Sequence, residues 1–334
     1  MQSYHVAILG ATGAVGREMI RVLEERQFPV KTLLPLSSSR SAGEKLSFCG
    51  EEVEVRETEP AVFRGVDLVL GAAGKNVAEA FAPAIRASGA VFVDNSSAFR
   101  LQKEVPLVVP EVNPEDAQWH QGIIANPNCT TIITVTAIQA LRMLSPIQAL
   151  QVSTYQAASG AGAAGPVELQ WQAEAFARGE PMEANVFAHP LAYNVIPQIG
   201  QEQEYGYTSE EMKLQYEGRK ILHIPDLRVS CTCVRVPVMR SHSVSVCVRL
   251  ERPISVEQAK MVLAKAPGCC LLDDLARNRY PMPLYTAGQD LVYVGRVRPD
   301  IVDPNGIVLW CCGDQLRKGA ATNAVQIAEL LAQS

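Results

Sequence analysis

The chain has 334 residues with a formal net charge of −5; 48% of the residues are hydrophobic and 19% are charged. This composition predicts a folded protein of about two domains, and its acidic balance argues against nucleic acid as the main partner. We see no basic-then-apolar leader and no apolar stretch long enough to cross a bilayer. We therefore expect a cytoplasmic protein that has no membrane partner.

Nine cysteines in a chain without a secretory leader are expected to be reduced thiols rather than a disulfide framework. Cys231 and Cys233 lie two residues apart on a strand-like run and so share a face. No other cysteine or histidine stands at ligand spacing before His242, so no metal site is expected.

Short apolar strands alternate with helical stretches in the first third of the chain. The strands are expected at 5–9, 31–36, 66–70 and 90–93, and the helices after Gly13 and at 77–87. Strand and helix taking turns predicts a doubly wound, Rossmann-type parallel sheet in an α/β domain.

The pattern changes after residue 145. The runs 147–155, 229–236, 243–250 and 291–297 are longer and richer in β-branched residues, which predicts a mixed, largely antiparallel sheet in an α+β domain. Residues 318–331 have helical spacing and can return to the first domain. We expect one domain from 1–127 with 313–334, and a second from 128–312.

A glycine-rich turn follows the first expected strand. Gly10, Gly13 and Gly16 permit a tight turn, close approach of the main chain to a pyrophosphate, and close helix packing, while the helix N-terminus faces the negative charge. Its place in an alternating domain favours dinucleotide binding over a plain strand-to-helix turn. The expected contacts are Gly10, Thr12, Gly13, Ala14, Val15 and Gly16.

The end of the second strand predicts the kind of nucleotide. An NAD site usually offers an acidic residue here to the ribose hydroxyls, and residues 37–43 contain none. Arg40 with Ser39 beside it suits a 2′-phosphate, although a solvated loop arginine is the alternative. We expect NADP rather than NAD.

Cys129 lies at the expected junction between a short buried strand at 122–125 and the helix that follows it. The first turn of a helix has unpaired N–H groups and the positive end of the dipole, which favour a thiolate and can hold an oxyanion. Cys129 is therefore a candidate nucleophile; a small buried thiol is the alternative.

A nucleophilic cysteine needs a proton acceptor within reach, and His242 is the strongest candidate among the five histidines. It follows an arginine-flanked turn between two strands, a place where reactive groups collect. Gln156 ends another strand in a glycine-rich loop, and Arg100 follows a strand at the ligand side of the first sheet. Glu210 and Lys213 share a helix face, and the residues alone favour a solvated ion pair there.

These motifs together resemble the aspartate-β-semialdehyde dehydrogenase family over essentially the whole chain. The segments that carry the resemblance are 10–16, 39–43, 94–100, 126–131, 153–162, 235–242 and 313–320. The resemblance implies NADPH-dependent reductive dephosphorylation of L-aspartyl 4-phosphate to L-aspartate 4-semialdehyde and phosphate, in lysine, methionine and threonine biosynthesis. It also implies a homodimer or a dimer of dimers, with residues 128–312 supplying catalysis and dimerisation.

The resemblance assigns roles by position. Cys129 matches the nucleophile that forms an acyl thioester, His242 the acid/base, and Gln156 the residue that orients the intermediate. Substrate and phosphate binding fall to Arg100, Asn128, Glu210, Lys213 and Arg235, with Arg235 on the α-carboxylate, Glu210 on the amino group, and Arg100 and Lys213 on the phosphate. Cofactor binding extends to Ser159, Gly160 and Gln315.

One position departs from the family pattern. Many similar members have Asn where Gln315 stands, near the nicotinamide carboxamide. Gln keeps the donor and acceptor on a longer arm, so we expect weaker NADPH binding at most.

Three other readings compete. N-acetyl-γ-glutamyl-phosphate reductase has the same two-domain plan, but its substrate lacks a free amine for Glu210 to bind. Glyceraldehyde-phosphate dehydrogenase shares the Cys-Thr-Thr step in different surroundings. A non-catalytic dinucleotide-binding relative is expected to have lost Cys129 or His242, and both are present.

Overall fold

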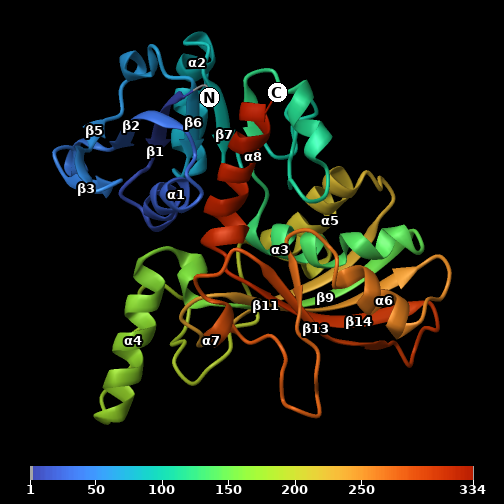
Figure 1. Cartoon of the computed structure of the whole chain (residues 1–334). Helices are drawn as coiled ribbons and strands as arrows, with labels where there is room; N and C mark the ends of the chain where they lie inside the picture. Colours follow the sequence, from blue (N-terminus) through green and yellow to red (C-terminus); the bar gives the residue numbers. More distant parts are fainter. Residues whose placement is uncertain (1–2, 334) are drawn as a thin grey trace. The chain divides into compact units, whose positions relative to one another are not determined.

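The computed structural model describes residues 3–333. These divide into two compact units: unit 1 holds the described residues up to 128 and those from 320 on, and unit 2 holds residues 129–319 (Figure 1). Within the described residues, each unit contains one six-stranded sheet.

The sheet of unit 1 has the order β5-β2-β1-β6-β7-β8, and all of its strand pairs are parallel. Its strands are β1 (Tyr4–Leu9), β2 (Val30–Ser37), β5 (Arg56–Glu57), β6 (Leu68–Gly71), β7 (Val91–Asp94) and β8 (Ile123–Ala125). A separate hairpin pairs β3 (Lys45–Phe48) with β4 (Glu51–Glu54). The expected parallel, doubly wound sheet is confirmed.

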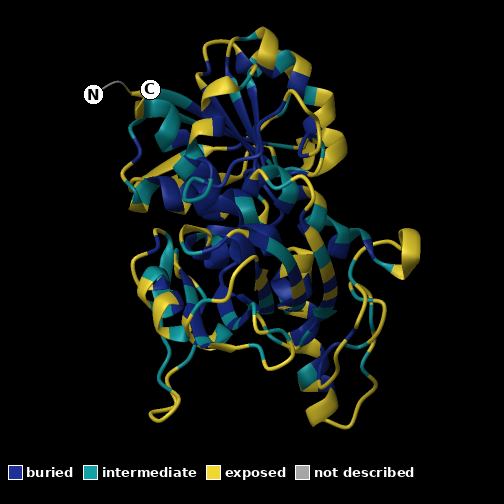
Figure 2. Cartoon of the chain, turned by 90° about the vertical axis from the view of Figure 1, so that its right-hand side faces the viewer, coloured by how far each residue is buried: buried dark blue, intermediate teal, exposed yellow. Residues whose placement is uncertain are grey.

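Three helices flank this sheet. They are α1 (Ala14–Glu25), α2 (Lys75–Ala87) and α8 (Thr322–Gln333). Apolar residues of α1 and α8 form one core cluster with the sheet, to which α2 contributes none. Buried residues make up nearly all of β6, β7 and β8 (Figure 2), as expected for a parallel sheet covered on both faces, whereas both residues of the edge strand β5 are exposed.

The sheet of unit 2 is mixed, with the order β10-β9-β11-β14-β13-β12. Three of its strand pairs are antiparallel, whereas β10 with β9 and β12 with β13 are parallel. Its strands are β9 (Ile147–Gln156), β10 (Arg228–Arg235), β11 (His242–Leu250), β12 (Cys269–Leu271), β13 (Val292–Pro299) and β14 (Gly306–Gly313). This confirms the mixed, largely antiparallel prediction.

The helices of unit 2 are α3 (Cys129–Ile138), α4 (Ala164–Ala177), α5 (Ser209–Leu222), α6 (Val256–Leu263) and α7 (Pro283–Thr286). Helices α3, α5 and α6 lie on one side of the sheet, and α4 projects away from it (Figure 1). Every residue of α3 after Cys129 is buried, including four threonines, so the helix is enclosed on all faces rather than amphipathic. The α-helix ends at Ile138 and is followed by a 3₁₀ turn at Gln139–Met143.

A π-helical turn at Arg317–Ala321 precedes α8. Turns of this kind recur at functional sites.

Within residues 3–333, each helix is too short or too polar to cross a membrane.

Candidate active site

Cys129 is the first residue of α3, as the strand-to-helix pattern predicts. Its side chain is half-buried, and a neighbour packs against it: a Cβ placed on Gly319 would lie 2.9 Å from the Cys129 Cβ. Only a glycine at position 319 leaves room for this thiol at the helix start. The location supplies main-chain N–H groups and a positive dipole end to a sulfur anion.

His242 is the first residue of β11 and is fully buried. The N–H of Ala157 donates to its Nδ1 at 3.1 Å, so the neutral ring carries its hydrogen on Nε2. Nε2 is buried and has no hydrogen-bond partner within the described part of the chain. Burial, and next the positive charge of Arg235, lower the pKa of His242 to about 3, with Glu210 opposing. His242 is thus a neutral imidazole with one N–H to offer.

Arg235 and Gln156 stand side by side because β10 and β9 pair in register at these two residues. Nη1 of Arg235 donates to the carbonyl of Ala157 at 2.6 Å, and the side chain is buried. Burial lowers the pKa of Arg235, and the charges of Cys129 and Glu210 oppose that shift. A negative charge on Cys129 therefore stabilises the charged form of the Arg235 guanidinium.

Glu210 comes to the same place from the first turn of α5. Its Oε1 accepts from Nε2 of Gln156 at 3.3 Å, and its Oε2 accepts from Nζ of Lys213 at 2.8 Å. Glu210 is buried while Lys213 is about one-third exposed. The pair is therefore not the solvated surface ion pair that the residues alone favoured, because one member contacts a candidate catalytic side chain.

Gly160 lies against two of these groups. A Cβ at position 160 would be 2.7 Å from Nη1 of Arg235 and 3.0 Å from Cε1 of His242. The glycine-rich loop at 157–162 therefore packs directly on the imidazole and the guanidinium, and a side chain at this position would displace one of them.

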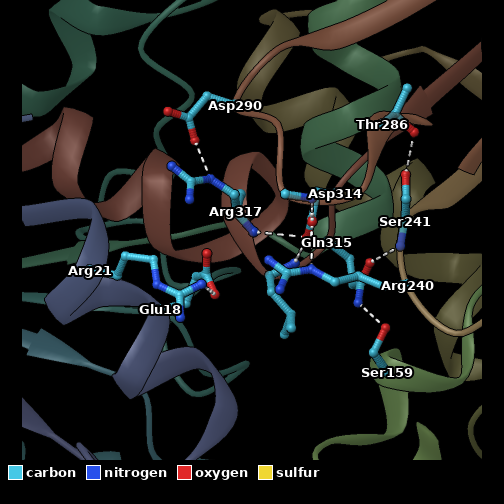
Figure 3. Close-up of polar contacts among 12 residues, drawn as sticks. Glu18, Arg21, Ser159, Arg240, Ser241, Thr286, Asp290, Asp314, Gln315 and Arg317 are labelled. Carbon is cyan, nitrogen blue, oxygen red and sulfur yellow. Dashed lines mark hydrogen bonds and ion pairs between the residues drawn. The ribbon is translucent and has the colours of Figure 1, made fainter. Parts of the chain in front are cut away.

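Gln315 and Ser159 are joined by a hydrogen bond from Nε2 of Gln315 to Oγ of Ser159 (Figure 3). Oε1 of Gln315 accepts from the N–H of Ser241, at 2.9 Å. Gln315 thus links the loop before α4 to the residue that precedes His242.

Arg100 and Asn128 lie in unit 1, and both are buried. Nε of Arg100 donates to the carbonyl of Asn126 at 3.0 Å, and Nη2 donates to the carbonyl of Asn95 at 2.8 Å. Nδ2 of Asn323 donates to Oδ1 of Asn126 at 2.6 Å, so the C-terminal helix supports this segment. Main-chain carbonyls hold the guanidinium at the end of β7.

The glycine turn of unit 1 fits a dinucleotide. Gly10 has a φ of +89°, and a Cβ on Gly16 would lie 2.3 Å from the carbonyl oxygen of Gly10. Gly13 caps α1 without a side-chain hydrogen bond, and no acidic residue occupies the first turn of this helix. The N-terminal N–H groups thus face no negative side chain from their own helix, as a pyrophosphate site requires.

The remaining candidates for the nucleotide surround this turn. Oγ1 of Thr12 lies 2.9 Å from Oγ of Ser37, which ties the turn to the end of β2. Ser39 and Arg40 are exposed on the short 3₁₀ turn that follows β2. Ala14 and Val15 begin α1 and are partly buried.

Unit 2 therefore contains most of the residues predicted for chemistry and substrate, which are Cys129, Gln156, Glu210, Lys213, Arg235 and His242. It also contains three residues predicted for the cofactor, which are Ser159, Gly160 and Gln315. Unit 1 holds Arg100, Asn128 and the residues predicted around the glycine turn. Pattern and spacing predict no role for Ala157, which acts through its main chain, or for Asp314, whose importance depends on contacts far along the chain.

Comparison with known proteins gives the same picture. Residues 5–120 match the family model described as semialdehyde dehydrogenase, NAD binding domain, and residues 138–318 match semialdehyde dehydrogenase, dimerisation domain. An aspartate-semialdehyde dehydrogenase of Synechocystis sp. is 52% identical over 328 residues, which cover 98% of this chain and 97% of the relative. The chain belongs to the aspartate-semialdehyde dehydrogenase family.

Two solved structures extend this comparison. Aspartate semialdehyde dehydrogenase II of Vibrio cholerae, complexed with ASA, has a TM-score of 0.97 at 44% identity, covering 100% of this chain and 99% of that one. The enzyme of Candida albicans with NADP has a TM-score of 0.76 at 26% identity, covering 99% of each chain. As an aspartate-semialdehyde dehydrogenase, this chain is an oxidoreductase with a NAD(P)-binding domain and a dimerisation domain.

Proposed function

We propose that the chain catalyses the NADPH-dependent reductive dephosphorylation of L-aspartyl 4-phosphate to L-aspartate 4-semialdehyde and phosphate, in the cytoplasm and in lysine, methionine and threonine biosynthesis. The assignment of the substrate rests on two buried charged groups that lie beside Gln156. These are the guanidinium of Arg235, on the neighbouring strand, and the carboxylate of Glu210, which accepts a hydrogen bond from Gln156. A cation and an anion held in this way complement the α-carboxylate and α-ammonium of a free amino acid. An N-acetylated substrate has no ammonium for Glu210.

Cys129 forms the covalent intermediate. Its thiolate attacks the carbonyl carbon of the acyl phosphate, the C–O bond to the phosphate breaks, and inorganic phosphate leaves with the electron pair. NADPH, when bound, supplies the hydride that reduces the resulting thioester. The tetrahedral anion on Cys129 then collapses to the aldehyde and releases the thiolate.

His242 acts on the oxygen of these intermediates. Because Nδ1 accepts from Ala157, the ring presents Nε2–H, a donor suited to an oxyanion. Thiolate attack releases phosphate, which takes up one proton as it becomes HPO₄²⁻ near neutral pH, whereas hydride addition creates an alkoxide that expels the thiolate and consumes none. Because the ring is neutral and carries its one hydrogen on Nε2, we assign His242 as a neutral hydrogen-bond donor, a narrower role than the acid/base that the family resemblance implies.

The phosphate and the cofactor have their own groups. Arg100, Asn128 and Lys213 are assigned to the phosphate, where two cations offset the net negative charge of the protein. The glycine turn with Thr12, Ala14 and Val15 is assigned to the pyrophosphate, and Ser159, Gly160 and Gln315 to the nicotinamide end. Exposed Arg40 with Ser39 supports NADP over NAD, because a guanidinium matches the charge of a 2′-phosphate.

The domain assignments follow from these roles. Residues 1–127 with 313–334 are assigned to NADP binding, and residues 128–312 to catalysis and dimerisation. Residues 313–319 fold as part of unit 2, so their assignment to NADP rests on the proposed role of Gln315 and not on the division into units.

We also propose a homodimer that forms through the sheet face of unit 2 opposite α3, α5 and α6. On that face the Tyr155 side chain is exposed and its ring centroid lies 5.3 Å from that of Trp310. Aromatic pairs of this kind are typical of interface centres. Sedimentation equilibrium should give a dimer for wild type and for Tyr216→Glu, whose tyrosine is exposed on α5, and a monomer for Tyr155→Glu. A dimeric Tyr155→Glu variant would place the interface elsewhere.

The activity is tested by phosphate-dependent reduction of NADP with aspartate semialdehyde, compared with N-acetylglutamate semialdehyde. We expect turnover of the first substrate only, and a loss of about 10³-fold or more in Cys129→Ser. Preference for the N-acetylated substrate would favour the reductase reading, and no turnover of either would favour the non-catalytic relative.

Cofactor choice is tested with the same assay. We expect a higher kcat/KM with NADP than with NAD, and a loss of that preference in Arg40→Ala. Equal kcat/KM values for the wild type would refute the assignment of Arg40.

A further inference from the structure

We propose that Asp314 is a positioning residue for His242, which it holds through the turn at 240–241. This inference rests on the proposed function, since it concerns the imidazole assigned to the oxyanion. Asp314 follows β14, and its carboxylate lies among Arg240, Gln315 and Arg317 (Figure 3).

The Asp314 carboxylate is fully buried and accepts four hydrogen bonds. Oδ2 accepts from Nε of Arg240 and from the N–H of Gly288, each at 2.6 Å. Oδ1 accepts from the N–H groups of Leu316 at 2.8 Å and Arg317 at 3.2 Å. A buried carboxylate with this many donors is fixed in place, and one of the donors is a compensating cation.

Two connections lead from this carboxylate to His242. Arg240 is two residues before His242, so its ion pair fixes one end of the turn. The N–H groups of Leu316 and Arg317 donate to Oδ1 and so fix the turn that carries Gln315. Oε1 of Gln315 in turn accepts from the N–H of Ser241. Both connections end on the residues directly before the imidazole.

Ser241 needs this support because of its backbone conformation. Its φ is +77°, a region that costs a residue other than glycine about 1–3 kcal/mol. Its hydroxyl lies 2.7 Å from that of Thr286, and both side chains are buried. A strained residue beside a catalytic group persists only where its surroundings hold it, and Asp314 organises the surroundings on this side.

An amide cannot replace this carboxylate. All four partners donate, so Asn at position 314 would turn an NH₂ group toward donors on one side and would remove the negative charge that pairs with Nε of Arg240. Asp314→Asn keeps the shape of the side chain and removes its function.

The test compares Asp314→Asn with the matched control Asp290→Asn. Asp290 accepts from Nε of Arg317 at 2.8 Å but is about one-third exposed, so solvent screens its charge. We expect kcat in the phosphate-dependent assay to fall about 10²-fold in Asp314→Asn and to stay within about threefold in Asp290→Asn. The KM for aspartate semialdehyde should change less than threefold in either, because Arg235 and Glu210 are untouched.

A double variant separates positioning from general damage. If Asp314 acts through His242, adding Asp314→Asn to His242→Ala should lower kcat by less than about threefold more. An undiminished 10²-fold further loss, or a normally folded Asp314→Asn with kcat within threefold of wild type, would overturn the proposal. If Asp314→Asn does not fold, Arg240→Gln decides, with an expected loss of about tenfold and recovery in Arg240→Lys; equal activity of all three Arg240 forms would refute it.

A readout that needs no turnover keeps the two proposals apart. The ring ¹⁵N shifts of His242, assigned by difference from His242→Gln, should show a protonated Nε2 and an accepting Nδ1 in wild type and in Asp290→Asn, and should change in Asp314→Asn. Unchanged shifts would count against Asp314 even if the chain proves inactive on aspartate semialdehyde.

Discussion

Ala157 determines which ring nitrogen of His242 can donate. Its N–H points at Nδ1 at 3.1 Å, while its carbonyl accepts from Arg235 at 2.6 Å, so one peptide residue orients two of the groups assigned to catalysis. Protonating Nδ1 would set two N–H groups against each other beside a guanidinium. The low pKa of His242, about 3, has burial as its main cause and the Arg235 charge as its second.

This pKa predicts how stability depends on pH. The unfolded chain binds a proton at this imidazole below about pH 6.5, whereas the folded chain does not until about pH 3. The contribution is therefore complete above pH 6.5 and is lost as the pH falls. Between pH 7.5 and pH 5, wild type should lose ~2 kcal/mol more of its free energy of unfolding than His242→Gln. Urea unfolding at both pH values measures this, and parallel losses would contradict it.

Gly160→Ala should damage catalysis without unfolding the chain. The new Cβ would meet Nη1 of Arg235 at 2.7 Å and Cε1 of His242 at 3.0 Å, and both side chains are held by Ala157. We expect kcat/KM to fall about 10²-fold. Gly74→Ala is the control, because nothing lies within 4 Å of a Cβ there. Steady-state kinetics with a thermal melt test this, and similar kinetics for both variants would show that the loop yields.

Gly16→Ala should destabilise the nucleotide turn. Its Cβ would lie 2.3 Å from the carbonyl oxygen of Gly10 and 2.7 Å from Cα of Ala11, and main-chain atoms cannot move aside cheaply. We expect a loss of about 1–3 kcal/mol and NADP affinity reduced more than tenfold. For stability, Gly13→Ala is the matched control, since its Cβ would be at an ordinary 3.4 Å from that oxygen. Melting without nucleotide and calorimetric titration with NADP measure the two effects. Equal melting temperatures would contradict the steric argument.

Asn323→Ala should weaken unit 1. Nδ2 of this buried residue donates to the carbonyl of Val108 at 2.9 Å and to Oδ1 of Asn126 at 2.6 Å. Removing the amide takes this donor away from two buried acceptors, and we expect the free energy of unfolding to fall by about 2 kcal/mol. Gln326→Ala on the same helix removes a partly buried bond to Glu111 and should cost less than ~0.5 kcal/mol. Denaturant melts of both variants test this ranking, and the reverse order would disprove it.

The sequence predicts the frame of the site better than its fine geometry. The glycine turn and the position of Cys129 at a helix start depend on residues close in the chain, so periodicity and turn residues are enough to predict them. The tautomer of His242 depends on Ala157, 85 positions away, which no local pattern records. Glu210 and Lys213 show the same limit: their spacing predicts an ion pair, but burial beside Gln156 comes from the packing of α5 on β10. Thr286 has no sequence signal at all, because its only distinction is a hydroxyl facing Ser241.

The enclosure of α3 limits how this protein can change. A helix with a solvent face can accept substitutions there singly, but the nine residues that follow Cys129 in α3 are all buried. A change of size at any of them must be matched by a change in a neighbour. In a laboratory evolution experiment, we expect accepted replacements to gather on exposed helices such as α4 and to be rare in α3, where they should occur as coupled pairs.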